Sequence, residues 1–322
     1  MLSAALLLAW TAAVAQSQPV GGAAAYPVRS IRFIVPFPPG GGNDIVGRIV
    51  AQHLQSALGQ SIVVDNRGGA GGTLGTDIAA KAPPDGYTLL INNVSLAINA
   101  TLFPKLPYDT LKDLAPVSLV GHQPSILLIH PGVKAKTVKE LLALARSQPG
   151  GLIYGSGGPG SSGHLATERL RLAAGITLTH VPYKGLGPAM TDLMGGRVEF
   201  IIATASTALP MLKAGKVEAL AVTTATRFTM LPQLPTMIEA GVPDYEVSTW
   251  YAVLVPAKTP PAVIARLNGE LTKMAGVASV QQQFAVQGID PAHSSPQQAF
   301  AHIKAEVERW GRVVKTAGIK PN

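Results

Sequence analysis

The sequence contains no cysteine, which excludes disulfide bonds, thiolate catalysis and cysteine-based metal sites. Charged residues are also scarce: they make up 14% of the 322 residues, against 47% for hydrophobic residues. A chain of this length and composition can bury large cores, so we expect a folded protein of two domains. After the first apolar segment, no run approaches the roughly 20 apolar residues that a membrane-spanning helix needs.

The charge balance is basic, with a net charge of +8, but the Lys and Arg residues are scattered along the chain. We therefore interpret this charge as solvated surface and expect no nucleic-acid partner. The seven histidines do not show the spacing typical of metal ligands, so no metal site is predicted.

The chain begins with an uncharged apolar segment, MLSAALLLAWTAAVA, which ends in an A-x-A-like cleavage site at Ala13 to Ala15. We expect residues 1–25 to comprise a signal peptide and a polar leader, with cleavage after Ala15 and export to the periplasm. The basic residues that usually begin a signal peptide are missing, so a membrane-anchored form is the alternative.

Beyond this segment, apolar runs of strand length alternate with stretches of helical spacing, which predicts parallel sheets in an α/β fold. The runs span residues 31–36, 61–65, 87–92, 152–154, 176–181, 198–203 and 217–223.

Two extended apolar segments, residues 117–131 and 245–256, interrupt this alternation. If the first carries the chain into an inserted domain and the second returns it, domain 1 comprises residues 26–120 and 252–322. Domain 2 then comprises residues 121–251. A double crossover of this kind forms a hinge between two domains that face each other across a cleft, a favoured place for a small-molecule site.

The C-terminal segment predicts an amphipathic helix that packs against domain 1. Ser295 and Pro296 have the identities preferred at the N-cap and at the first helical position. The apolar residues at spacings of three and four are Phe300, Ile303, Val307, Trp310 and Val314.

The glycine-rich turn FPPGGGND (37–44) lies between a predicted strand and a predicted helix. It is not a phosphate-binding P-loop, because Gly42 and Gly47 are followed by Arg48 and Ile49 instead of Lys and a hydroxyl residue.

A second turn, GSGGPGSSGH (155–164), contains the G-x-G-x-x-G spacing of dinucleotide-binding proteins. The following strand should then end in an acidic residue that binds a ribose. It offers His180, Tyr183 and Lys184 instead, so no cofactor is predicted.

Both turns place glycines between the end of a strand and the start of a helix. The first turn of a helix exposes free backbone N–H groups, which bind anions. If each domain contributes one such turn to the cleft, the two turns can hold a carboxylate from opposite sides.

The chain also resembles a known family, the periplasmic solute receptors of tripartite tricarboxylate transporters (the Bug family). The resemblance runs from about Tyr26 to the C-terminus through an ordered series of blocks. These include YPVRSIRFIVPFPPGGGNDIVGR, VVDNRGGAGGTLGTDIAAKAPPDGYTLL, GSGGPGSSGHLATE, HVPYKGLGPAMTDLMGGRVEF and LPTMIEAGVPDYEVSTWYAVLVPAKTP.

This resemblance implies a two-domain periplasmic binding protein, a type II-like Venus flytrap with two crossover segments. It implies a monomer that binds a small organic mono- or dicarboxylate and delivers it to a two-subunit membrane permease, without catalysis. By the same resemblance, the ligand is held by loops of both domains. The residues carried over are Phe37, Pro38, Gly40, Gly41, Gly42, Asn43, Asp44, Ser156, Gly157, Ser161, Ser162, His164, Tyr183, Lys184 and Thr204.

Three polar residues at the end of the third predicted strand, Asn92, Asn93 and Ser95, occupy the expected edge of the crevice, although they are equally reasonable as helix caps. For Asp44 we favour orientation of its own loop over ligand contact. Of Ser161 and Ser162, one should cap the helix and the other face the cleft.

Two other functions remain open from the residues alone. One is an exported serine hydrolase that uses Ser161 or Ser162 with His164, although no nucleophile-elbow motif is present. The other is an effector-binding partner of a sensor protein.

Overall fold

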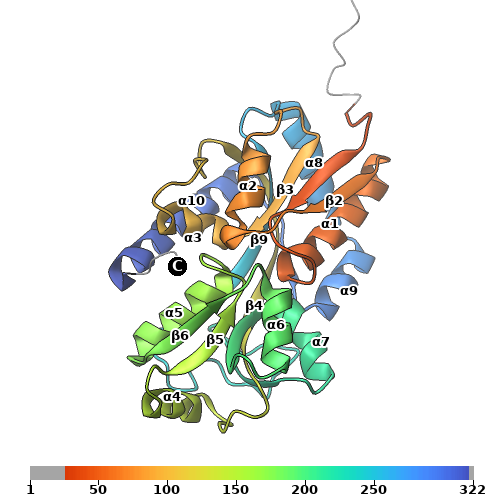
Figure 1. The fold of residues 1–322 in the computed structure, drawn as a ribbon. Coiled ribbons are helices and arrows are strands. Elements are labelled where there is room, and N and C mark those ends of the chain that lie inside the picture. Colours follow the sequence, from red (N-terminus) through yellow and green to blue (C-terminus); the bar gives the residue numbers. More distant parts are fainter. Residues whose placement is uncertain (1–25, 319–322) are drawn as a thin grey trace, which may run out of the picture.

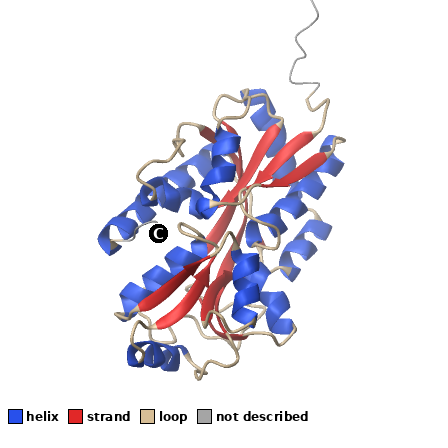
Figure 2. Cartoon of the chain, in the orientation of Figure 1, coloured by secondary structure: helices blue, strands red, loops and turns tan. Residues whose placement is uncertain are grey.

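The strands of the structure, a computed structural model that describes residues 26–318, run as one continuous ladder through two lobes (Figure 1). The predicted signal peptide lies outside the described residues. The strand order is β2-β1-β3-β9-β4-β7-β5-β6, and β10 and β8 pair with β4 in addition. In Figure 2 these strands run diagonally through the molecule, with helices on both sides.

We call the upper part of Figure 1 lobe 1. Its parallel strands β1, β2 and β3 are extended by antiparallel β9, by the first part of β4 and by β10. The strands are β1 (Ile31–Val35), β2 (Ile62–Asn66), β3 (Thr88–Asn93), β4 (Leu114–Ile129), β9 (Ser248–Pro256) and β10 (Asp290–Pro291). The helices are α1 (Gly42–Leu58), η2 (Ala70–Gly72), α2 (Thr73–Ala80), α3 (Ser95–Leu102), α8 (Pro261–Met274), α9 (Ala278–Val286) and α10 (Pro296–Ala317).

Lobe 2, the lower part of Figure 1, is built on the last residues of β4. Strands β7 and β8 pair antiparallel with β4, and β5 runs parallel to β6 and β7. The strands are β5 (Leu152–Ser156), β6 (Leu178–Pro182), β7 (Phe200–Thr204) and β8 (Glu218–Val222). The helices are α4 (Val138–Ser147), α5 (Ser162–Ala174), α6 (Leu186–Met194) and α7 (Ala205–Lys213).

The alternation of apolar runs thus located the strands, since each predicted run overlaps a strand of the structure. Parallel pairing is confirmed for β1 to β3 and for β5 to β7. It is wrong for β8, which pairs antiparallel with β4. The reason is that β4 passes through both lobes and runs antiparallel to β7, β8 and β9. The apolar pattern of a single strand does not show in which direction its neighbour runs.

The two extended segments are the strands β4 and β9, which pair antiparallel over most of the length of β9. Residues up to Pro124 of β4 pair with β9, whereas residues from Ser125 onward pair with β7 and β8. β4 therefore connects the two lobes, and we propose that the two predicted domains correspond to them.

The predicted amphipathic helix is α10, which packs against α3 and β4. The side chain of Ser295 caps its N-terminus in a capping box with Gln298. Ile303 and Trp310 are buried as expected, but Phe300 is 39% exposed, because the neighbouring Ala299 takes the buried position in that turn. Within residues 26–318, no helix is both long and apolar enough to cross a membrane.

Candidate functional site

A small cavity, of about 20 Å³, lies between the lobes, at the carboxyl ends of the parallel strands. This is the edge of an α/β sheet where ligands usually bind. Both glycine-rich turns contribute to its wall. The lining residues are Phe37, Gly41, Gly42, Asn43 and Asn93 from lobe 1, and Gly157, Ser161, Ser162, Leu186 and Thr204 from lobe 2.

The turn after β1 presents the start of α1 to this cavity. Gly41 is the N-cap of α1, and no side chain caps this helix. A side chain at Gly42 would collide with the hydroxyl oxygen of Tyr251 and lie 2.9 Å from that of Thr204. Glycine at position 42 therefore lets the helix start approach both β9 and lobe 2.

The carboxylate of Asp44 holds this turn in place through hydrogen bonds. Its carboxylate accepts hydrogen bonds from the Gly40 N–H group (3.0 Å), from Arg48 Nε (2.9 Å) and from Asn66 Nδ2 (3.0 Å). Asn66 also donates to the Phe37 carbonyl oxygen (2.9 Å). Asp44 does not line the cavity, and its contacts fit the loop-orienting role that the sequence favoured. Asn66 was missed, although it ends the strand adjacent to β1.

The turn after β5 is held by its own side chains. Ser156 Oγ accepts from the Gly158 N–H group (3.1 Å) and lies 2.7 Å from Nε2 of His180. His164 Nδ1 accepts from the Gly160 N–H group (3.2 Å). Ser156 and His164, both predicted as ligand contacts, are thus engaged within the loop and do not line the cavity.

Ser161 and Ser162 both line the cavity at the start of α5. Ser161 is the N-cap, and its hydroxyl oxygen accepts from the backbone N–H group of His164. The imidazole ring of His164 is engaged with Gly160 instead, so it is not positioned as a base for Ser161.

The imidazole rings of His164 and His180 stack at 4.4 Å, and Tyr154 stacks on His180 at 4.7 Å. Burial lowers the pKa of each histidine to about 4, and the proximity of His164 adds to this effect at His180. Both rings are therefore neutral at neutral pH and give the cavity no positive charge.

Of the remaining lobe 2 residues that the sequence predicted, Thr204 lines the cavity, whereas Tyr183 and Lys184 do not. Tyr183 donates a hydrogen bond to Asp192 Oδ2 (2.7 Å), and Lys184 is exposed; neither lines the cavity. Leu186, two residues beyond Lys184 and the first residue of α6, does line it and was not predicted. Thr204, the N-cap of α7, lines the cavity as predicted.

At the end of β3, only Asn93 lines the cavity, and its Oδ1 accepts from the Ser95 N–H group (2.9 Å). Asn92 instead donates to Thr76 Oγ1 (2.9 Å), and Ser95 is fully buried. Asn43 is 3% exposed, and its Oδ1 has no hydrogen-bond partner among the described residues.

The electrostatic character of the cavity comes from helix termini. Of the described helices, α1, α5, α6 and α7 each contribute an N-cap or a first residue to its wall. No charged side chain is among the described residues that line it. Because helix N-termini carry partial positive charge and free N–H groups, this arrangement favours an anion.

The lobes contact each other around the cavity through glycines. A side chain at Gly71 would collide with the Pro159 carbonyl oxygen, and one at Gly160 would collide with Asn99 Oδ1. Similarly, a side chain at Gly185 would lie 2.6 Å from the ring of Pro38. The turn at residues 68–72 and Pro38 thus touch the opposite lobe beside the cavity without lining it.

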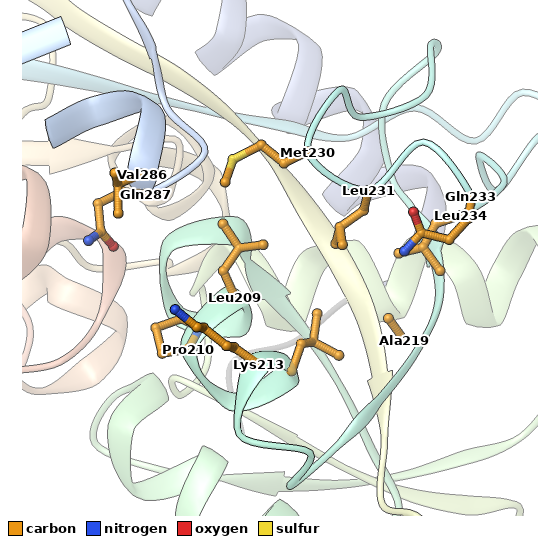
Figure 3. A pocket seen from close by; sticks show the side chains of 11 residues that line it. Leu209, Pro210, Lys213, Ala219, Met230, Leu231, Gln233, Leu234, Val286 and Gln287 are labelled. Atoms are coloured by element: carbon orange, nitrogen blue, oxygen red, sulfur yellow. The ribbon is translucent and has the colours of Figure 1, made fainter. Parts of the chain in front are cut away.

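A larger groove, of about 710 Å³, lies between α7, the segment 230–234 and the end of α9 (Figure 3). Apolar side chains, among them Leu209, Met230 and Val286, surround it in the close-up. Lys213 is the only charged residue of its described lining, and no helix N-terminus opens into it. This groove lacks the features that would hold a carboxylate. No group of His, Asp and Glu residues suited to a metal ion occurs within residues 26–318.

The family model described as the tripartite tricarboxylate transporter family receptor matches residues 46–319. The chain is 41% identical over 297 residues to Protein BugT of Bordetella pertussis (strain Tohama I), covering 92% of this chain and 91% of that protein.

Solved structures of three related proteins share the fold. R. palustris Rpa4515 with adipate has a TM-score of 0.89 and 38% identity, covering 92% of this chain and 100% of that one. The periplasmic binding protein BugD has a TM-score of 0.89 and 32% identity, covering 92% and 99%. MatC from Rhodopseudomonas palustris with bound malate has a TM-score of 0.85 and 31% identity, covering 90% and 100%. The fold is therefore the α/β periplasmic binding protein fold.

Proposed function

Since this chain belongs to the family of tripartite tricarboxylate transporter receptors, we propose that it binds a small organic carboxylate between its lobes and delivers it to a membrane permease. The family comprises binding proteins, not enzymes, which removes the serine hydrolase alternative.

The convergence of the N-termini of α1, α5, α6 and α7 on one cavity carries this proposal. These termini supply hydrogen-bond donors on both sides of the cavity, as a carboxylate requires. The adipate and malate named with two relatives each carry two carboxyl groups. A small dicarboxylate is therefore the first ligand to test.

Within the cavity, we assign the carboxylate contacts to backbone N–H groups and to neutral polar side chains. Asn43 and Asn93 serve from lobe 1, and Ser161, Ser162 and Thr204 from lobe 2. Phe37 and Leu186 are the apolar residues of the wall, suited to the carbon chain of the ligand. Asp44, Ser156 and His164 hold the loops around the cavity instead.

Ligand contacts from both lobes give a physical reason for closure. A ligand that touches both lobes binds the closed state more tightly than the open one, and it shifts the population toward the closed state. At a ligand concentration of 100 times the dissociation constant, binding adds about 2.7 kcal/mol to the free energy of unfolding.

A thermal-shift panel after denaturation and refolding, which removes any bound acid, tests this function. The panel comprises adipate, malate, succinate, citrate, aspartate and benzoate. We expect at least one acid to raise the melting temperature. If none does, the receptor proposal fails.

Ser162→Ala is the site variant for the acid that binds best. Since a hydrogen bond to a charged group contributes about 1.5–3 kcal/mol, we expect at least about tenfold weaker binding by calorimetry. Ser56→Ala is the control, because Ser56 bonds only to the Gln52 carbonyl oxygen on the outer part of α1. Equal affinities of both variants would contradict the assigned contact.

Delivery to a permease requires a periplasmic location and a partner in the membrane. We propose that the receptor acts there as a monomer and presents its closed form to the two permease subunits. Cell fractionation and crosslinking in the native organism, with and without the acid, test this step. Capture of a sensor protein in place of permease subunits would favour the sensor alternative.

A further inference from the structure

A buried polar cluster, which we call the hinge cluster, lies beside the cavity and consists of Gln123, Thr204, Ser206 and Tyr251. Tyr251 donates to Gln123 Oε1 (3.1 Å). The amide nitrogen of Gln123 donates to Ser206 Oγ (3.1 Å), and the Ser206 hydroxyl donates to Gln123 Oε1 (3.2 Å). Ser206 Oγ lies 3.5 Å from Thr204 Oγ1. All four side chains are 2% exposed or less.

The members of the hinge cluster come from both lobes and from the two strands between them. Tyr251 lies on β9, in the part that pairs with β3 of lobe 1. Gln123 lies on β4, next to the point where this strand changes its partners from lobe 1 to lobe 2. Thr204 and Ser206 lie at the junction of β7 and α7 in lobe 2. The cluster therefore crosses the hinge.

The cluster also reaches the proposed ligand from two directions. Thr204 lines the cavity directly. The hydroxyl oxygen of Tyr251 lies against the backbone of Gly42, the first residue of α1, which also lines the cavity. A ligand held by α1 and α7 thus rests on residues that contact the hinge cluster.

The cost of burying polar groups explains why these hydrogen bonds favour the closed arrangement of the lobes. A buried hydroxyl or amide costs free energy unless it is hydrogen-bonded, and removing its partner leaves that cost uncompensated. Tyr251 and Gln123 lie on the paired strands β9 and β4, and Gln123 bonds in turn to Ser206 at the start of α7 in lobe 2. A hinge rotation that separates the lobes therefore lengthens the bonds between Gln123 and Ser206. The full set of bonds belongs to the closed arrangement of the lobes.

We propose that Tyr251 and Gln123 are positioning residues that couple occupation of the cavity to closure of the hinge. The proposal rests on the proposed function, because it concerns how the same cavity closes over its ligand. The hydroxyl of Tyr251 stabilises the closed lobes without contacting the ligand.

The test compares two tyrosine-to-phenylalanine variants that remove the same group. Tyr251→Phe deletes the hydroxyl in the hinge cluster. Tyr245→Phe is the matched control, because Tyr245 is also fully buried and donates one hydrogen bond, to the Ala166 carbonyl oxygen (2.7 Å), within lobe 2. Both variants should lower the melting temperature by a similar amount, since each loses one buried hydrogen bond.

Ligand kinetics should separate the two variants. Losing one hydrogen bond of the closed state should weaken binding by Tyr251→Phe about 3- to 10-fold, mainly through faster dissociation, with the association rate retained. Tyr245→Phe should keep the wild-type dissociation rate. Ser206→Ala should reproduce the effect of Tyr251→Phe, and the double variant should lose less than the sum, because both changes act on one cluster.

A distance measurement between spin labels follows closure with and without ligand. Since the chain has no cysteine, Gln52→Cys on α1 and Lys216→Cys after α7 place one label on each lobe. We expect Tyr251→Phe to increase the fraction of long distances, and Tyr245→Phe to leave it unchanged. Wild-type distances and dissociation rate in Tyr251→Phe would overturn the proposal. If the wild-type protein binds no acid, the proposed function fails, and the label distances of the free protein alone decide the inference.

Discussion

At the scale of single residues, the glycines around the cavity set how closely the lobes approach. Gly71 has a φ of 63° and faces the Pro159 carbonyl oxygen of the opposite lobe, so a side chain at this position meets a backbone atom. Because a backbone atom cannot move aside as a flexible side chain can, the lobes themselves would have to separate.

The variant Gly71→Ala should therefore hold the lobes apart and weaken ligand binding at least about tenfold, as measured by calorimetry. Gly59→Ala is the control: Gly59 has a φ of 68° and open space around its missing side chain. Both variants carry the strain of alanine in the left-handed region, so the difference between them reports the collision with Pro159. Unchanged affinity in Gly71→Ala would show that the contact does not limit closure.

The buried histidines make stability depend on pH. Burial lowers the pKa of His164 and His180 from 6.5 to about 4, so between these values the unfolded chain binds more protons than the folded one. Stability is then complete above pH 6.5 and is lost as the pH falls from 6.5 toward 4.

Melting temperatures measured from pH 7.5 to 4.5 test this dependence. We expect a plateau above pH 7 and a decline below pH 6.5, with a shallower decline in His180→Gln. The exposed His293 is the control position, and His293→Gln should retain the wild-type slope. An identical slope in His180→Gln and the wild-type protein would exclude the buried pair as the cause.

At the scale of elements, helix starts serve two purposes in this fold. The starts of α1 and α7 have no side-chain cap and face the cavity. The start of α10, in contrast, is closed by the capping box of Ser295 and Gln298. In α10 a side chain therefore satisfies a first-turn N–H group, whereas the uncapped starts of α1 and α7 face the cavity.

Ser295→Ala should lower the free energy of unfolding by about 1 kcal/mol, because it removes the N-cap of a helix that packs against α3 and β4. Denaturant unfolding monitored by circular dichroism measures the loss. Ser279→Ala in the first turn of α9 is the control, since Ser279 is exposed and α9 has no side-chain cap. If both variants lower the free energy of unfolding equally, the hydrogen bond of Ser295 does not stabilise α10.

The elements also show where the apolar pattern is informative. Strand positions follow from runs of apolar residues, because the central strands β3, β7 and β9 are buried on both faces. The antiparallel pairing of β8 with β4 and the exposure of Phe300 do not follow, since they depend on which neighbour occupies the adjacent space.

At the scale of the whole molecule, closure should be visible in tryptophan fluorescence. Trp250 lies on β9, beside His302 at a ring distance of 5.3 Å, and donates to Glu306 Oε2 (3.1 Å). Trp310 on α10 donates to the same oxygen (3.1 Å). A rotation about β4 and β9 changes the surroundings of Trp250 first.

We expect a ligand-dependent change in emission that is lost in Trp250→Phe and retained in Trp310→Phe. Titration of the acid selected by the thermal-shift panel measures it, and the midpoint should equal the calorimetric dissociation constant. A full signal in Trp250→Phe would place the moving tryptophan on α10 instead.

The sequence by itself determined the α/β class, the two extended crossing segments and the position of the two glycine-rich turns between a strand and a helix start. These features follow from local rules: apolar runs form buried strands, and glycines before a helix expose N–H groups. Gly41, Gly42, Asn43, Ser161, Ser162 and Thr204 were predicted as ligand contacts, and all of them line the cavity.

Only the tertiary structure decided which polar side chains face the cavity and which support it. Ser156, His164 and Tyr183 are engaged with Gly158, Gly160 and Asp192, whereas Leu186 lines the cavity. Tyr251 lies next to the site only because the fold places its hydroxyl group on β9 against Gly42. The direction of a side chain depends on partners that are distant in the chain, so the site took its shape from packing between the lobes.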